Sequence, residues 1–137
     1  MFKWKEEFSS QIEKFDEQHK QLFNLGNDLV NAIQSNQHAD HYDEIMASID
    51  ALKDYTEYHF NAEEALLEKH QYPKLMSHKM QHKKFLAKIE SFYEKDIDEN
   101  QVEITMEMVH FIADWIQNHI LKVDAEYGDF LNEKGEF

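Results

Sequence analysis

Seven residues of the types that bind transition metals lie at four places along the chain. Five are histidines and two are carboxylates: His19, His59, Glu63, His78, His82, His119 and Asp124. Each place falls in a run whose apolar residues recur at helical spacing, and the members of each pair are four or five residues apart, so their side chains converge from one helix. Four helices that direct these groups inward would form a metal site.

The other histidines have positions typical of surface residues. His38, His41 and His70 fall in predicted loops or at helix ends, and His110 precedes His119 by nine residues, which turns an ideal helix by about 900° and places the two on opposite faces. A single core histidine is usually structural. Buried ionisable groups cost several kcal/mol unless paired or bound to metal, so five histidines on four core stripes favour a metal site.

The spacing of His119 and Asp124 predicts an irregular helix. Five residues turn an ideal α-helix by about 500°, which would leave these two side chains about 140° apart. Both can point inward only if the helix contains a π-bulge or loosens near Leu121, as helices often do at functional sites.

The ligand set favours two transition-metal ions. Five imidazoles with two carboxylates are too many for one tetrahedral zinc and too rich in nitrogen for calcium or magnesium. If Glu63 and Asp124 bridge two ions together with a solvent oxygen, a metal with three histidines has six ligands and a metal with two has five. The second metal then keeps an open position for a small ligand. Zinc or manganese would suit the same donors.

Composition favours one all-α domain over residues 1–137. Hydrophobic residues make up 42% of the chain and charged residues 31%, and three glycines with one proline argue against a sheet protein. The net charge of −14 opposes binding to nucleic acid or to an anionic membrane. The absence of cysteine excludes disulfides, thiolate catalysis and iron–sulfur clusters.

We expect a cytoplasmic protein, and the acidic surface favours a soluble monomer. Residues 1–10 alternate aromatic and charged side chains and have no apolar core of a signal peptide. No segment approaches the roughly 18 apolar residues of a membrane span.

The apolar pattern predicts an antiparallel up-down-up-down four-helix bundle over residues 16–132, preceded by an N-terminal arm over residues 1–15. The arm packs its apolar residues across the bundle. The first helix runs from an N-cap at Asp16 to about Asn36, and the second from an N-cap at Asp40 to the breaker Gln71–Pro73. Pro73 suits the first turn of the third helix, which fades at residues 94–100. The fourth helix covers about 101–123, with a further turn or short helix at 125–131. The aromatic and apolar residues of the arm are Phe2, Trp4, Phe8, Ile12 and Phe15.

Four segments together resemble the hemerythrin family, in particular its single-domain bacterial members. They are Asp16-x-Gln18-His19, His59-Phe60-x-x-Glu63-Glu64, Tyr72-Pro73 before His78-x-x-x-His82, and Trp115-Ile116-x-x-His119-Ile120-x-x-x-Asp124. The resemblance spans nearly the whole chain. It implies a non-haem di-iron site, with His78, His82 and His119 on one iron, His19 and His59 on the other, and Glu63 and Asp124 as bridges.

The same resemblance implies that dioxygen binds reversibly at the two-histidine iron. The matching pocket residues are all apolar, as a site that binds oxygen while excluding water requires. These residues are Leu22, Phe60, Trp115, Ile116 and Ile120.

Other functions are compatible with a di-iron site. Oxygen, redox or nitric-oxide sensing is one, and a di-iron oxidase or peroxidase is another. Oxygen-activating bundles usually carry two Glu-x-x-His motifs, whereas here only Glu107-x-x-His110 matches, and no separate acid or base is expected in the pocket. We therefore expect a protein for oxygen carriage, storage or delivery and not an enzyme, with an oxygen-accepting or reductase protein as a further partner.

Overall fold

The computed structural model describes residues 2–34, 42–94 and 101–137, without the side chains of residues 42, 101, 102, 104 and 105. Its long helices are α1 (Glu13–Gln34), α2 (Tyr42–Lys69), α3 (Leu75–Tyr93) and α4 (Gln101–Asn118). A π-helix (His119–Asp124) continues α4 into α5 (Ala125–Glu133), and a short 3₁₀ turn, η1, covers Glu6–Phe8. The predicted loops at 35–40 and 95–100, the Asp40 cap, His38 and His41 lie outside the described residues.

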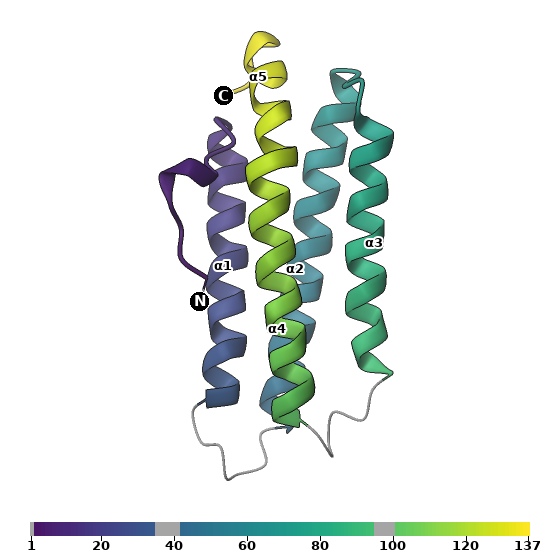
Figure 1. The fold of residues 1–137 in the computed structure, drawn as a ribbon. Coiled ribbons are helices and arrows are strands. Elements are labelled where there is room, and N and C mark those ends of the chain that lie inside the picture. Colours follow the sequence, from purple (N-terminus) through teal and green to yellow (C-terminus); the bar gives the residue numbers. More distant parts are fainter. Residues whose placement is uncertain (1, 35–41, 95–100) are drawn as a thin grey trace.

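The four long helices run alternately up and down, as predicted (Figure 1). The turn between α2 and α3 contains Gln71, whose φ of 57° is left-handed, followed by Pro73. Proline disfavours helical backbone at the preceding residue, so α2 ends here as predicted. Pro73 nevertheless lies two residues before α3 and not in its first turn.

The N-terminal arm, which was predicted to pack across the bundle, lies along α1 (Figure 1) with Phe2 and Phe8 buried. The Phe2 ring lies against Gly26, where a Cβ atom would come within 2.7 Å of it, and Asn27 exchanges two hydrogen bonds with the Phe2 backbone. Trp4 and Phe8 pack on Phe23. The arm therefore covers one side of the bundle with aromatic rings.

The first helix begins at Glu13, three residues before the predicted N-cap. Ile12 accepts the first backbone hydrogen bonds, from Phe15 and Asp16. The Asp16 carboxylate instead accepts three hydrogen bonds from Ser9 and Ser10, at 2.5 to 2.8 Å. Asp16 thus connects the arm to the first turn of α1 through hydrogen bonds and is not the N-cap of this helix.

Two apolar clusters fill the interior. The larger one lies between the four long helices and includes Phe23, Ile49, Phe85 and Ile112. The smaller one joins Ile12, Phe15, Leu67, Tyr72, Tyr127 and Leu131. On α2, Leu67 is buried whereas Leu66 is only partly buried.

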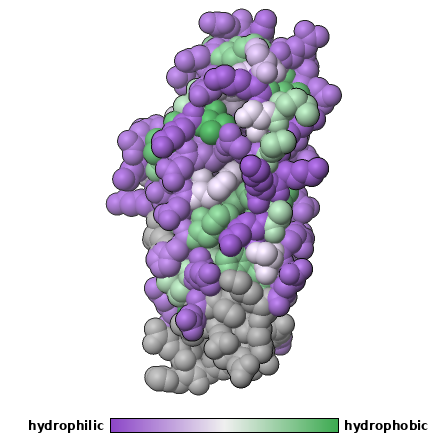
Figure 2. Space-filling model, turned by 45° about the vertical axis from the view of Figure 1, so that its right-hand side comes forward, coloured by the Kyte–Doolittle hydropathy of each residue, from purple (hydrophilic) through white to green (hydrophobic). Residues whose placement is uncertain are grey.

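The side formed by α3 and α4 is mainly hydrophilic, with a strip of hydrophobic residues along its middle (Figure 2). Within the described residues, no helix has both the length and the apolar character needed to cross a membrane.

Candidate metal centre

Helices α1, α2 and α3 and the π-helix that continues α4 bring all seven predicted ligand residues together. Each side chain is at most 5% exposed. His78, His82 and His119 form one group, and His19, His59, Glu63 and Asp124 form the other, with the candidate ligand atoms of each group within 4.8 Å of one another. The structure thus divides the candidate ligands into a three-histidine group and a two-histidine group.

The predicted irregularity at His119 and Asp124 is present as a π-helix that spans these two residues. Its i→i+5 hydrogen bonds place residues five apart on the same face. Asp124 consequently points inward, with Oδ1 3.1 Å from His119 Nε2.

Each carboxylate directs one oxygen to each group. Glu63 Oε1 lies 2.5 Å from His59 Nε2, whereas Glu63 Oε2 lies 3.5 Å from His78 Nε2. Asp124 Oδ2 lies 3.1 Å from His19 Nε2, and Asp124 Oδ1 faces His78 and His119 at 3.3 and 3.1 Å. This arrangement suits carboxylates that span two cations.

Seven buried polar atoms at the centre have no hydrogen-bond partner among the described residues. They are both carboxylate oxygens of Glu63 and Asp124, both ring nitrogens of His19, and Nε2 of His78. A buried polar atom left unpaired costs about 1–3 kcal/mol, and more if charged. Most of these atoms face one another at the distances given above, so the residues fit a pair of cations whose coordination would satisfy them.

The electrostatics also favour anionic carboxylates. Burial and the Asp124 carboxylate act to raise the pKa of Glu63, but the imidazoles of His59 and His78 outweigh them and hold it well below its usual value. Burial opposes ionisation of Asp124 too, yet its histidine neighbours lower its pKa. Burial lowers the pKa of His59, which favours the neutral ring that a metal binds.

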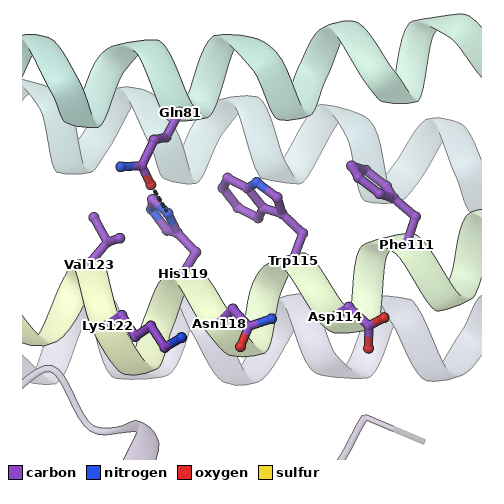
Figure 3. Close-up of a pocket in the computed structure, with 8 residues that line it drawn as sticks. All are labelled: Gln81, Phe111, Asp114, Trp115, Asn118, His119, Lys122 and Val123. Carbon is purple, nitrogen blue, oxygen red and sulfur yellow. Dashed lines mark hydrogen bonds between the residues drawn. The ribbon is translucent and has the colours of Figure 1, made fainter.

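Three side chains outside the predicted ligand set form hydrogen bonds with the Nδ1 atoms of the imidazoles. Gln18 Oε1 lies 2.6 Å from His59 Nδ1, Glu64 Oε2 lies 2.9 Å from His82 Nδ1, and Gln81 Oε1 lies 3.1 Å from His119 Nδ1 (Figure 3). An acceptor at Nδ1 fixes the tautomer that leaves Nε2 free to bind a metal. Sequence reasoning gave these residues no role, although each directly follows or precedes a predicted ligand.

Aromatic rings stack on two of these imidazoles. Phe60 stacks on His82 with ring centroids 3.7 Å apart, and Trp115 stacks on His119 at 4.3 Å (Figure 3). Tyr127 packs against His78, and burial, together with the nearby carboxylates, raises the pKa of its phenol. These contacts restrict the orientation of the histidines.

A small cavity of about 10 Å³ lies beside the two-histidine group. Its walls contain His19 and His59, the edges of His119 and Asp124, and all five residues predicted to form a pocket: Leu22, Phe60, Trp115, Ile116 and Ile120. Thr56, a polar residue that was not predicted to belong to the pocket, also lines it. The Thr56 hydroxyl is engaged, since it donates to the Leu52 carbonyl at 2.7 Å.

Two of the remaining histidines lie where predicted. His110 is exposed on α4, on the side away from the centre. His70 is near the C-terminal end of α2, where its Nε2 lies 3.1 Å from Glu136 Oε1. Neither contributes to the centre.

Comparisons with known proteins agree with this architecture. The sequence profile of the hemerythrin HHE cation binding domain matches residues 10–131. The chain is 43% identical to the bacteriohemerythrin of Clostridium acetobutylicum over 94% of this chain and 100% of that protein. It is 33% identical to the bacteriohemerythrin of Methylococcus capsulatus over 92% of both chains.

A crystal structure of wild-type hemerythrin superimposes on this fold with a TM-score of 0.78 and 32% identity, covering 93% of this chain and 95% of that one. The matched profile includes every residue of the two ligand groups. The chain therefore belongs to the hemerythrin family, and it is similar to the bacteriohemerythrins of that family.

Proposed function

We propose that this chain binds dioxygen reversibly at a pair of iron ions, for oxygen carriage, storage or delivery. His78, His82 and His119 would hold one iron, and His19 and His59 the other. Glu63 and Asp124 would bridge them, since each turns one oxygen to each histidine group. Two ferrous ions so held would supply the electrons that reversible binding of dioxygen requires.

The cavity beside His19 and His59 is the observation that carries this proposal. It adjoins the group with fewer histidines, which is the side where ligand counting leaves a coordination position open. Ile116 and Ile120, each 3% exposed, close it with apolar side chains. A small neutral ligand fits such a space better than an organic substrate, because the cavity has room for about one water-sized molecule.

The residues around the cavity explain why binding would be reversible. Water and protons promote irreversible oxidation of an oxygen-binding iron centre, with loss of the oxygen in reduced form, and an apolar wall excludes both. The Thr56 hydroxyl is directed to the Leu52 carbonyl, so its proton is already used in a hydrogen bond. Apart from the proposed metal ligands, no described side chain of the cavity wall offers a free acid for oxygen reduction, and this supports binding over catalysis.

The proposal is tested with ligand variants reconstituted anaerobically with ferrous iron. Wild type should hold two irons per chain and take up one dioxygen, which argon removes. His59→Ala should lose tight binding of the second iron and all oxygen uptake, whereas His110→Ala should match wild type because His110 is exposed and distant. Two tightly bound irons and normal uptake in His59→Ala would refute the ligand assignment.

A further inference from the structure

The outer side of α3 carries positive charge in an otherwise acidic chain. Residues 74–88 contain five lysines and no acidic residue, so all 28 acidic residues and only nine of the 14 basic ones lie elsewhere. Lys83, Lys84 and Lys88 are exposed and Lys79 is half-buried. The helix that holds His78 and His82 on its inner face is thus basic on its outer face.

Three of these lysines are available for a partner. Lys74 pairs with Glu126 at 2.6 Å, and Lys88 lies over the rings of Phe92 and Phe111. Within the described part of the chain, Lys79, Lys83 and Lys84 show no ion pair. We call them the lysine face. Met80, 59% exposed, lies among them and adds apolar surface.

The lysine face borders a groove that reaches a candidate iron ligand. The groove, of about 450 Å³ between α2 and α3, is lined by Lys79 and Lys83 on α3 and includes His82. The groove also contains two carboxylates, but both are engaged. Glu64 bonds to His82 Nδ1, and Glu57 lies 4.0 Å from Lys53. Two lysines therefore lie beside the two carboxylates where the groove reaches His82, and the exposed Lys84 adds positive charge next to them on α3.

The cavity proposed for dioxygen is distinct from this groove, with which it shares Phe60 among the lining residues. It adjoins His19 and His59, and its only histidine from the other group is His119. A protein bound at the lysine face would approach the three-histidine group without covering that cavity.

We propose that the lysine face binds an acidic one-electron carrier protein, which restores the ferrous state through His82. This inference rests on the proposed function, because an oxygen-binding centre that has oxidised to the ferric state must be reduced before it binds oxygen again. One reduced carrier gives up one electron and one ferric ion becomes ferrous, so two carriers serve each centre. The lysines attract and orient the carrier and exchange no electron or proton themselves.

Other polyanions suit this face less well. A duplex or an anionic vesicle presents charge over a wide area, and it would meet the acidic residues that dominate the rest of the surface. A small acidic protein can place its charge on the lysine face alone. The partner is therefore a protein with a localised acidic patch around its redox group.

The experiment uses the full-length, iron-loaded ferric protein and a reduced acidic [2Fe–2S] ferredoxin as the probe. Binding is measured by calorimetry with redox-inert, gallium-substituted ferredoxin, and reduction by stopped-flow absorbance at about 0.1 M salt, where charges beyond roughly 10 Å are screened. The test variant is Lys79→Glu/Lys83→Glu/Lys84→Glu. The matched control is Lys3→Glu/Lys5→Glu/Lys14→Glu, which makes the same charge change at exposed positions on the arm and α1.

We expect the α3 variant to lower both affinity and reduction rate by about tenfold or more, with the control within about twofold of wild type. Dithionite should reduce all three proteins at equal rates. Equal losses of affinity and rate in both triple variants would overturn the proposal, and so would reduction rates that do not fall with added salt. Tighter binding to a DNA duplex or an anionic vesicle than to the ferredoxin would overturn it as well. A protein that bound ferredoxin at α3 but held no iron would instead contradict the proposed function alone.

Discussion

At the scale of single residues, the buried histidines and carboxylates of the centre were predictable and their supporting neighbours were not. A histidine or carboxylate on an apolar stripe contradicts the pattern around it, so it can be recognised in sequence. Gln18 and Gln81 lie at the edge of a helix face, where a glutamine is unremarkable. Only the packed bundle shows that Gln18 reaches His59 on α2 and that Gln81 reaches His119.

Replacing Gln18 should weaken metal binding without unfolding the chain. In Gln18→Leu, the 2.6 Å contact with His59 Nδ1 is lost and the ring no longer has a preferred tautomer. Loss of such a partner typically lowers metal affinity by about 10- to 100-fold, measurable by competition with a chelator. Gln18→Glu keeps an acceptor and should retain the affinity. Equal affinities in wild type and Gln18→Leu would show that Gln18 does not orient His59.

Ile116 should control how long the oxygenated form survives. It is 3% exposed and lines the cavity beside His19 and His59. Ile116→Ser removes apolar volume and admits water, and we expect autoxidation to quicken by about tenfold, equivalent to ~1.4 kcal/mol of barrier. Ile116→Val keeps the wall apolar and should change the rate far less. The decay of the visible band in air measures both, and identical decay in wild type and Ile116→Ser would place the oxygen site elsewhere.

At the scale of elements, periodicity predicted the helices and one of their irregularities. The five-residue spacing of His119 and Asp124 could be satisfied only by a local change in helical pitch, and the π-helix provides it. The start of α1 was misplaced because Asp16 is a good N-cap in isolation. Its carboxylate has better partners in Ser9 and Ser10, which the arm brings back to it.

The contact between the arm and α5 should be sensitive to a single methyl group. A Cβ atom on Gly128 would lie 2.1 Å from the Ser10 carbonyl oxygen, a backbone atom. Gly128→Ala should therefore destabilise the protein by about 1–3 kcal/mol, despite the gain in helix propensity. Gly26→Ala meets the Phe2 ring, which can shift with the arm, and should cost less. Urea denaturation compares the two, and an unchanged midpoint in Gly128→Ala would show that the arm is free to move away from α5.

At the scale of the whole molecule, a polar centre connects two apolar clusters. The sequence predicted this layer, because ligands interrupt each stripe where apolar residues would otherwise continue. The lysine face is also visible in sequence, but its relation to His82 depends on the groove between α2 and α3. The single domain, the cytoplasmic location and the monomeric state remain predictions.

Without metal, the stability of the protein against unfolding should fall as the pH rises into the alkaline range. In the metal-free protein, burial lowers the pKa of His78, but the carboxylates of Asp124 and Glu63, 3.3 and 3.5 Å from its Nε2, outweigh it and raise that pKa to about 10. Protonated His78 therefore stabilises the folded state fully below the pKa of histidine in the unfolded chain, roughly 6.5. This stabilisation is lost as the pH rises towards 10. The urea midpoint of the metal-free protein should fall over this interval, and that of His78→Gln should fall less. A flat profile for the metal-free wild type would contradict this charge arrangement.

The most direct test of the oxygen-binding claim is an optical spectrum taken through cycles of oxygenation and deoxygenation on protein reconstituted with ferrous iron. We expect two irons per chain and a visible charge-transfer band that appears with oxygen, disappears under argon and returns with oxygen over several cycles. An immediate, irreversible change to a ferric spectrum, with no band that argon removes, would contradict reversible oxygen binding.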